Sequence, residues 1–232
     1  MATRPTAHRI AKLKNLAVAT GVLAGLGGFI HGIGEVLQGS SSPAGVVFDS
    51  WTQGRIATNL GGEPAMSLIP NTLLTGLLTM AASLAVIAWA LRFLDHRYGG
   101  RGLAALSVLM LLVGGGFGPP ILGLLAALPA GAAHRVVRVR SWTRTRGGRA
   151  LAATWPALFW LCLADATFLV LGSVTAGVVL NLDISAAFVY ALFLAAAAMP
   201  VATLAGIAHD ALRVQAVPSS PQPAGAGTRT SA

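Results

Sequence analysis

Three ionisable side chains that could do chemistry lie inside long apolar stretches of the sequence. His31 and Glu35 are four residues apart in one stretch, and Asp165 lies in another. A charged group inside a bilayer is costly, so such residues are by default candidates for function. On a helix, His31 and Glu35 lie within contact of each other. They could relay a proton, hold a cation or donate two ligands to a metal whose identity stays unknown. Asn71, at the start of a third stretch, could line the same cavity.

Each of these residues also has a purely structural interpretation. Glu35 lies near the end of its apolar stretch, where it could hydrogen-bond to the following loop, and His31 could be satisfied in the same way. Asp165 could bond to backbone groups freed by a broken helix. We nevertheless expect Asp165 and His31 to form one polar cluster, because each lies about 21 to 22 Å along its helix.

The composition places all three residues in a membrane protein. Of the 232 residues, 55% are hydrophobic and only 10% are charged, against about 25% charged in a soluble domain. The mean hydropathy is +0.72. These values exclude a soluble globular domain and a largely disordered chain. The single Cys162 excludes a disulfide-stapled module.

Hydrophobic runs of about 20 residues or more, the length that crosses a bilayer, predict an all-α, polytopic membrane helix bundle. A basic N-terminus (1–15) precedes the membrane domain (16–208), and a disordered tail (209–232) follows it. The expected elements of the membrane domain are four full spans, 16–37, 67–91, 151–180 and 184–208, and one broken apolar block, 102–133.

A Gly/Pro turn interrupts the broken block. Its residues are Gly114, Gly115, Gly116, Phe117, Gly118, Pro119 and Pro120. Gly and tandem Pro oppose a continuous helix there. We therefore expect a helical hairpin, either re-entrant or a pair of short crossings. Broken helices at membrane depth expose free backbone groups that bind ions or substrate groups, although a packed kink without a ligand would have the same sequence.

Positive charge sets the orientation, because Lys and Arg accumulate in cytoplasmic loops. With a hairpin, 15 of the 16 Lys and Arg lie on one side, whereas a single crossing would divide them seven to nine. Both termini are thus expected in the cytoplasm. Six arginines between the hairpin and the third full span are expected to contact anionic lipid headgroups, so nucleic acid is not needed as a partner. These are Arg135, Arg138, Arg140, Arg144, Arg146 and Arg149.

Four glycines lie on about one third of the circumference of the first helix, the face that also carries His31 and Glu35. They are Gly21, Gly25, Gly28 and Gly32. Small residues spaced by four let helices approach closely. The face is therefore expected to pack against another helix, of this chain, of a second copy in a homo-oligomer, or of a different membrane partner.

The stretch from Gly28 to Gly39 and the turn from Gly114 to Pro120 resemble small, uncharacterised bacterial multi-pass membrane proteins that carry a His-Gly-x-x-Glu helix and a Gly-rich break. The resemblance implies a bacterial plasma-membrane location and no activity. Motifs for phosphate binding, serine hydrolysis, zinc proteolysis and dithiol chemistry are absent from the sequence, so catalysis is not supported and no cofactor is expected. Two functions are favoured: a small transporter or channel-like protein for an ion or small solute, and a non-transporting structural or accessory subunit. A third, less favoured alternative is an intramembrane enzyme that uses His31, Glu35 and Asp165 as acid, base or metal ligands.

The charge distribution generates a test of topology. A cysteine introduced at Ser141, in the arginine-rich loop, should be protected in intact cells from a membrane-impermeant thiol reagent and should react after the cells are opened. Labelling from outside the cell would contradict the hairpin arrangement.

Overall fold

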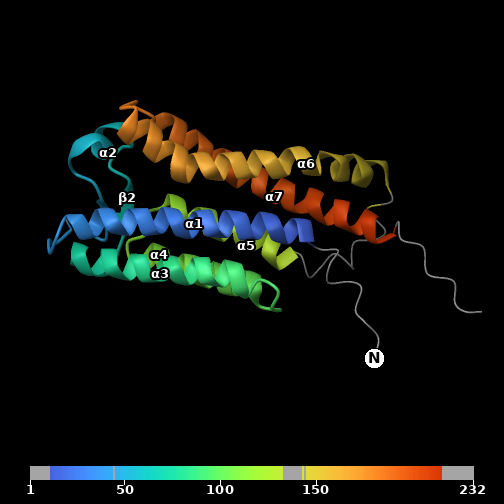
Figure 1. Cartoon of the computed structure of the whole chain (residues 1–232), viewed down its shortest axis with the longest axis horizontal. Coiled ribbons are helices and arrows are strands. Elements are labelled where there is room, and N and C mark those ends of the chain that lie inside the picture. Colours follow the sequence, from blue (N-terminus) through green and yellow to red (C-terminus); the bar gives the residue numbers. More distant parts are fainter. Residues whose placement is uncertain (1–10, 44, 133–142, 144, 216–232) are drawn as a thin grey trace, which may run out of the picture.

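The computed structural model describes residues 11–43, 45–132, 143 and 145–215, and these residues form an all-α bundle (Figure 1). The helices are α1 (Ala11–Leu37), α2 (Gly54–Asn59), α3 (Thr72–Arg92), α4 (Gly99–Leu112), α5 (Gly118–Ala132), α6 (Arg146–Thr167) and α7 (Ser185–Gln215). Two π-helical segments, η4 (Phe168–Gly172) and η5 (Thr175–Val179), continue α6, and two short strands are β1 (Val47–Asp49) and β2 (Pro64–Met66). The long helix α1 lies between α3 and the α6–α7 pair.

Four of the described helices are long and apolar enough to cross a membrane. They are Lys12–Leu37, Thr72–Arg92, Arg146–Val179 and Ser185–Arg213. The predicted second span began too early, at 67, because Pro70 precedes Asn71, whose side chain caps the helix by accepting a hydrogen bond from the Leu74 amide. The predicted tail also began too early, at 209.

Helix α7 continues to Gln215 because its last turns still face the protein interior. Ala208, Asp210 and Ala211 are all buried. A helix whose inner face remains covered gains packing energy from each additional turn. Residues 209–215 therefore belong to the bundle and not to the predicted tail.

Helices α4 and α5 form an antiparallel hairpin. Gly100 at the start of α4 lies directly against the backbone of Gly131 at the end of α5, and Gly123 packs on Ser107 midway. The helices have only 14 and 15 residues, which is about 21 to 22 Å each at 1.5 Å per residue. The hairpin therefore begins and ends at one end of the bundle, near the start of α1, and its turn points to the other.

The glycine face of α1 packs inside the chain. Gly32 lies so close to α3 that a Cβ atom on it would be 2.8 Å from the carbonyl oxygen of Gly76, and one on Gly25 would be 2.8 Å from that of Ser83. Gly28 meets Met110 of α4, and Gly21 meets Ala90 of α3. The predicted small-residue contact exists, and its partners are α3 and α4.

The segment between α1 and α3 folds into a cap over the end of the bundle. Strands β1 and β2 pair antiparallel, with Phe48 opposite Ala65. The Ser67 amide donates to the Val46 carbonyl, and the Leu68 amide donates to the Leu112 carbonyl at the end of α4. The cap is thereby tied to the turn of the hairpin, although the sequence predicted only a loop here.

The close contact between α1 and α3 can be tested with Gly32→Ala. The added methyl group would meet backbone atoms of Gly76, so we expect a loss of unfolding free energy of about 1 to 3 kcal/mol, measured by denaturant unfolding in detergent. Gly131→Ala is the matched control, since a Cβ at this helical glycine meets nothing within 4 Å. Equal stabilities of the two variants would contradict the packing.

Candidate functional site

His31 and Glu35 meet at the capped end of the bundle, and both are withdrawn from solvent. His31 is 3% exposed and Glu35 is 0% exposed. His31 Nε2 lies 3.8 Å from Glu35 Oε1, and the Ser50 hydroxyl bridges the two at 2.8 Å from Nε2 and 3.3 Å from Oε1. The other ring nitrogen, Nδ1, lies 3.2 Å from Glu63 Oε2. The four side chains therefore form the series Glu63–His31–Ser50–Glu35, which we call the relay.

Strand pairing in the cap places Ser50 and Glu63 on the imidazole. The ladder of β1 and β2 continues beyond Asp49 and Pro64, where the Ser50 amide donates to the Glu63 carbonyl at 3.4 Å. Residues directly opposite in an antiparallel pair lie on the same face. The Gln38 side chain, from the end of α1, also donates to the Ser50 carbonyl and holds it over His31.

Glu63 has an unusual backbone conformation. Its φ is +44°, and it follows Gly61 and Gly62, with φ of +66° and +77°. Left-handed conformations are uncommon for residues other than Gly, and helical conformations are disfavoured before a proline such as Pro64. Such strain costs roughly 1 to 3 kcal/mol and clusters at functional sites. The strained turn aims the Glu63 carboxylate at His31.

The predicted Gly/Pro turn closes over the relay. A Cβ on Gly114 would be 2.8 Å from Glu35 Oε2, and one on Gly116 would be 2.9 Å from His31 Nδ1. Both glycines have positive φ, +111° and +70°. The turn therefore needs glycine twice over, for its backbone conformation and for its contact with the two buried side chains.

The hydrogen-bonding capacity of the four side chains allows one assignment of donors and acceptors in which a proton is shared within the relay. An ionised Glu35 can only accept, so Ser50 donates to it and His31 Nε2–H donates to the Ser50 oxygen. In this assignment the 3.2 Å contact between His31 Nδ1 and Glu63 also holds one proton, on the imidazole or on the carboxyl. The second Glu35 oxygen, Oε2, is buried without a hydrogen-bond partner, which leaves it able to accept a proton.

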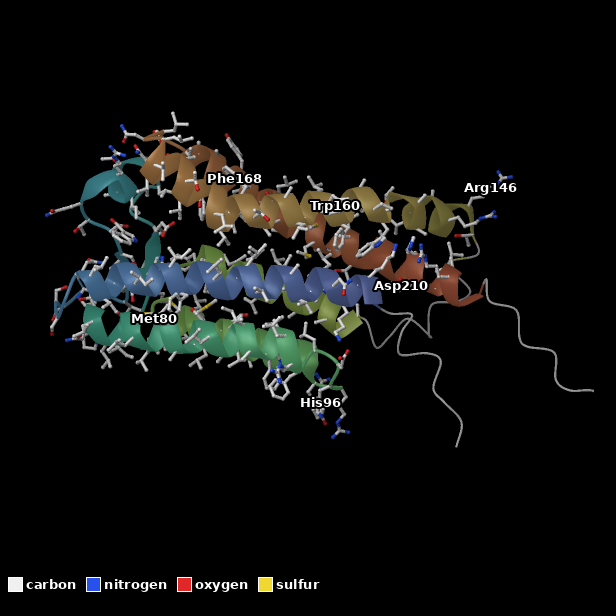
Figure 2. The ribbon with its side chains drawn as sticks, in the orientation of Figure 1. Met80, His96, Arg146, Trp160, Phe168 and Asp210 are labelled. Atoms are coloured by element: carbon white, nitrogen blue, oxygen red, sulfur yellow. The ribbon has the colours of Figure 1, made fainter. Side chains whose placement is uncertain are left out.

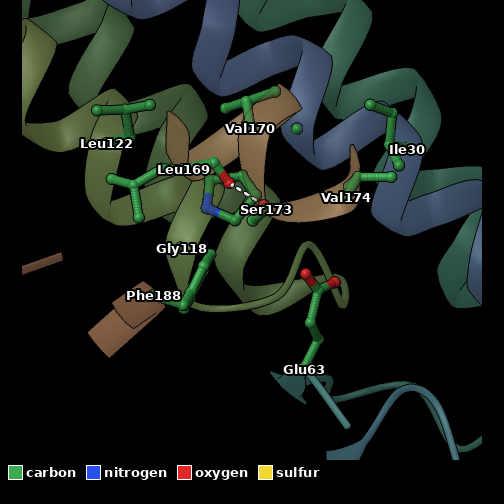
Figure 3. A pocket seen from close by; sticks show the side chains of 11 residues that line it. Ile30, Glu63, Gly118, Leu122, Leu169, Val170, Ser173, Val174 and Phe188 are labelled. Carbon is green, nitrogen blue, oxygen red and sulfur yellow. Dashed lines mark hydrogen bonds between the residues drawn. The ribbon is translucent and has the colours of Figure 1, made fainter. Parts of the chain in front are cut away.

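A cavity of about 310 Å³ opens beside the relay. Phe117 and Pro119 of the turn, Leu60 of the cap, and Phe188 and Leu192 of α7 line it together with His31 and Glu63. Glu63 also borders a second, narrow cavity of about 30 Å³ between α5 and η4. Figure 3 shows the Glu63 carboxylate below the apolar side chains of Leu169 and Val174.

The start of α7, beside the larger cavity, carries a capping carboxylate. Ser185 donates its hydroxyl at 2.8 Å and its amide at 3.1 Å to Asp183 Oδ1. These hydrogen bonds, the one from the hydroxyl first, hold the pKa of Asp183 below its usual range. Asp183 is therefore an ionised helix cap and not part of the relay.

The relay is not built as a metal centre. Among the described residues, no group of three or more His, Cys, Asp or Glu side chains is arranged to hold a metal ion. The reason is geometric, because Glu63 faces Nδ1 of His31 whereas Glu35 faces Nε2. A metal ion bound to one nitrogen of the His31 ring would therefore be next to only one of the two carboxylates.

Asp165 lies away from His31, so the expected pair between them is wrong. Its neighbour Ala166 packs with Ala24 of α1. Ala24 lies about 10 Å nearer to the start of α1 than His31 does, at 1.5 Å per residue. Helix α6 is shifted along α1 relative to the expected arrangement, because Trp155 lies level with Leu13, near the start of α1, where both pack around Gly206. Asp165 is 8% exposed, and its Oδ2 has no hydrogen-bond partner.

The remaining predicted residues fall in two places. Asn71 caps α3 and donates to the Ser40 hydroxyl at 2.7 Å, outside the relay. Of the predicted lipid-binding arginines, Arg135, Arg138, Arg140 and Arg144 lie outside the described residues, whereas Arg146 and Arg149 are in the first turn of α6.

Sequence reasoning missed four polar residues. Ser50 and Glu63 lie in the segment taken as a loop, where the only local signal was Glu63 between Gly62 and Pro64. The other two missed residues are Asp210 and the preceding residue, His209. Asp210 is 1% exposed, and neither of its carboxylate oxygens is hydrogen-bonded. Figure 2 shows Asp210 near the end of the bundle where Arg146 lies, far from the cap.

The fold and the site define a helical bundle with four helices fit to cross a membrane and a buried polar relay at one end. Comparison of the chain with family models, with curated proteins and with solved structures finds no match.

The partners of His31 can be tested by double-mutant cycles on unfolding free energy in detergent. His31→Gln and Glu63→Gln should couple by about 0.5 to 3 kcal/mol, because His31 Nδ1 and Glu63 Oε2 are in direct contact at 3.2 Å. His31→Gln and Asp165→Asn should be additive to within about 0.5 kcal/mol. Coupling to Asp165 as large as coupling to Glu63 would contradict the assignment.

Proposed function

We propose that this protein is a small membrane transporter that carries protons, in which the relay takes up and releases the proton. The observation that carries the proposal is the unbroken series from Glu63, 22% exposed, through His31 and Ser50 to the fully buried Glu35. Chains of carboxylates and histidine inside membrane proteins mark proton pathways. A purely structural pair of His31 and Glu35 would not need the second carboxylate, Glu63.

A line of hydroxyl groups continues from Glu35 down one face of α3. Its members, all fully buried, are Thr75, Thr79 and Ser83. Thr79 donates to the Val113 carbonyl at 3.0 Å, and Ser83 contacts the Met110 sulfur at 3.3 Å. The line favours a path for protons that enters from the cap.

Beyond Ser83, towards the end of the bundle opposite the cap, apolar side chains close the path. Val86 and Ala90 of α3, Leu103 of α4 and Ala17 of α1 form one buried cluster. A channel needs a continuous wet route, whereas a transporter exposes its site to one side at a time. The closed lower half therefore favours a transporter over a channel.

The orientation that fits this function has the cap outside and both termini in the cytoplasm of a bacterial cell. The described basic residues support it. Lys12, Lys14, Arg92, Arg97, Arg101, Arg146, Arg149 and Arg213 belong to the helix ends and the α3–α4 connection opposite the cap, and Arg55 belongs to the cap. Lys14 also pairs with Asp95 across that end at 2.5 Å. We further propose that α4 and α5 enter the bilayer as a hairpin and return, and that the arginines contact anionic lipids.

The alternative function, an accessory subunit that packs through its glycine face, loses its main support. Gly25, Gly28 and Gly32 already contact α3 and α4. The face is therefore occupied within one copy of the chain.

The proposal is tested by proton flux into liposomes that contain the purified protein and a pH-sensitive dye. Under an imposed pH gradient and membrane potential, Glu35→Gln and Ser50→Ala should each slow the flux by about tenfold or more, equivalent to about 1.4 kcal/mol in the barrier. Asp165→Asn, a buried carboxylate outside the relay, is the matched control and should leave it unchanged. Equal rates in wild type, the variants and empty liposomes would overturn the proposal.

A further inference from the structure

We infer that the 310 Å³ cavity beside the relay binds a small apolar molecule with a protonated amine, and that this ammonium group displaces the proton shared by His31 and Glu63. The inference rests on the proposed function, because it names the solute that the relay would exchange for a proton. It is carried by the shape, the lining and the charge of the cavity.

The size and walls of the cavity define the apolar part of the molecule. A volume of about 310 Å³ is about ten times the share of one water in the liquid and at the low end of small-molecule sites. Leu60, Phe117, Phe188, Val189 and Leu192 supply apolar walls from three separate elements. Val189 is 48% exposed, so the cavity opens past α7.

The polar groups of the cavity define the charged part of the bound molecule. Glu63 is the single acidic residue that lines the cavity, and neither Lys nor Arg lines it. A carboxylate in apolar surroundings favours a cation that can donate hydrogen bonds, and charge-assisted bonds are the stronger kind. An anion would meet the Glu63 carboxylate without a counter-charge, and a neutral molecule would gain no charge-assisted hydrogen bond from it.

Charge balance couples the amine to the proton. The titratable groups facing His31 are Glu35 on its own helix and Glu63 from the cap, while the hairpin turn presents glycines. Without amine, one proton lies between His31 Nδ1 and Glu63. When an ammonium group neutralises Glu63, this proton is no longer required and leaves to solvent. One cation therefore enters for each proton released, and no bond to carbon is made or broken.

The experiment is a calorimetric titration of the full chain in detergent with benzylammonium chloride or with uncharged benzyl alcohol, in two buffers of different ionisation enthalpy. The buffers report the protons released. We expect saturable binding of benzylammonium, release of about one proton per site, and an affinity for benzyl alcohol lower by about tenfold or more. Glu63→Gln should abolish this preference. Equal affinities, or binding without proton release, would overturn the inference.

Variants of α7 locate the binding site. Leu192→Trp fills the cavity and should weaken benzylammonium binding by about tenfold or more, whereas Leu194→Trp, at a position that does not line the cavity and is 42% exposed, should not. Leu192→Phe is a smaller filling if the Trp variant unfolds. Equal binding by the filled and control variants would overturn the inference. Proton flux into liposomes is measured without amine, so it tests the relay alone. Proton flux combined with a failure to bind benzylammonium would reject the cavity ligand and leave the proposed relay standing.

Discussion

The burial of Glu35 is the constraint on which the capped end of the structure depends. Its side chain has no exposed surface, and an uncompensated charge in such a place is expensive. Three separate segments meet to surround it: α3 from the side, the hairpin turn at Gly114, and the cap through Ser50. Each of them needs a close approach to α1, which explains why glycines occur at the facing positions of α1, α3 and the turn.

The cap and the hairpin depend on each other for the same reason. In the proposed membrane arrangement the turn needs partners for its free backbone groups, and the cap supplies one of them through the hydrogen bond from the Leu68 amide to the Leu112 carbonyl. The hairpin in turn provides the surface on which the cap orients Glu63. The relay therefore exists only when α1, the cap and the hairpin are assembled together, although they are far apart in the chain.

The sequence predicted the helices and half of the relay, for physical reasons that also explain the misses. Apolar length and the glycine spacing on α1 are local properties, so the spans and the inward direction of His31 and Glu35 followed from them. Ser50 and Glu63 are positioned by strand pairing and by a left-handed turn, which depend on contacts distant in sequence. Asp165 was misplaced because depth along a helix fixes one coordinate only, and the relative height of two helices is set by packing.

The short hairpin makes the molecule uneven in thickness. Helices α4 and α5, with 14 and 15 residues, rise about 21 to 22 Å, less than the roughly 30 Å hydrocarbon core of a bilayer. The apolar segment Arg146–Val179 has 34 residues, ample for the full core and for tilt. With the hairpin inside the bilayer, as proposed above, the lipid would thin on the hairpin side and not on the α6 side, at a cost of a fraction of a kcal/mol per Å of hydrophobic mismatch. The deformation would be one-sided, so lipids with short or fluid acyl chains would be favoured along the hairpin side of the protein only.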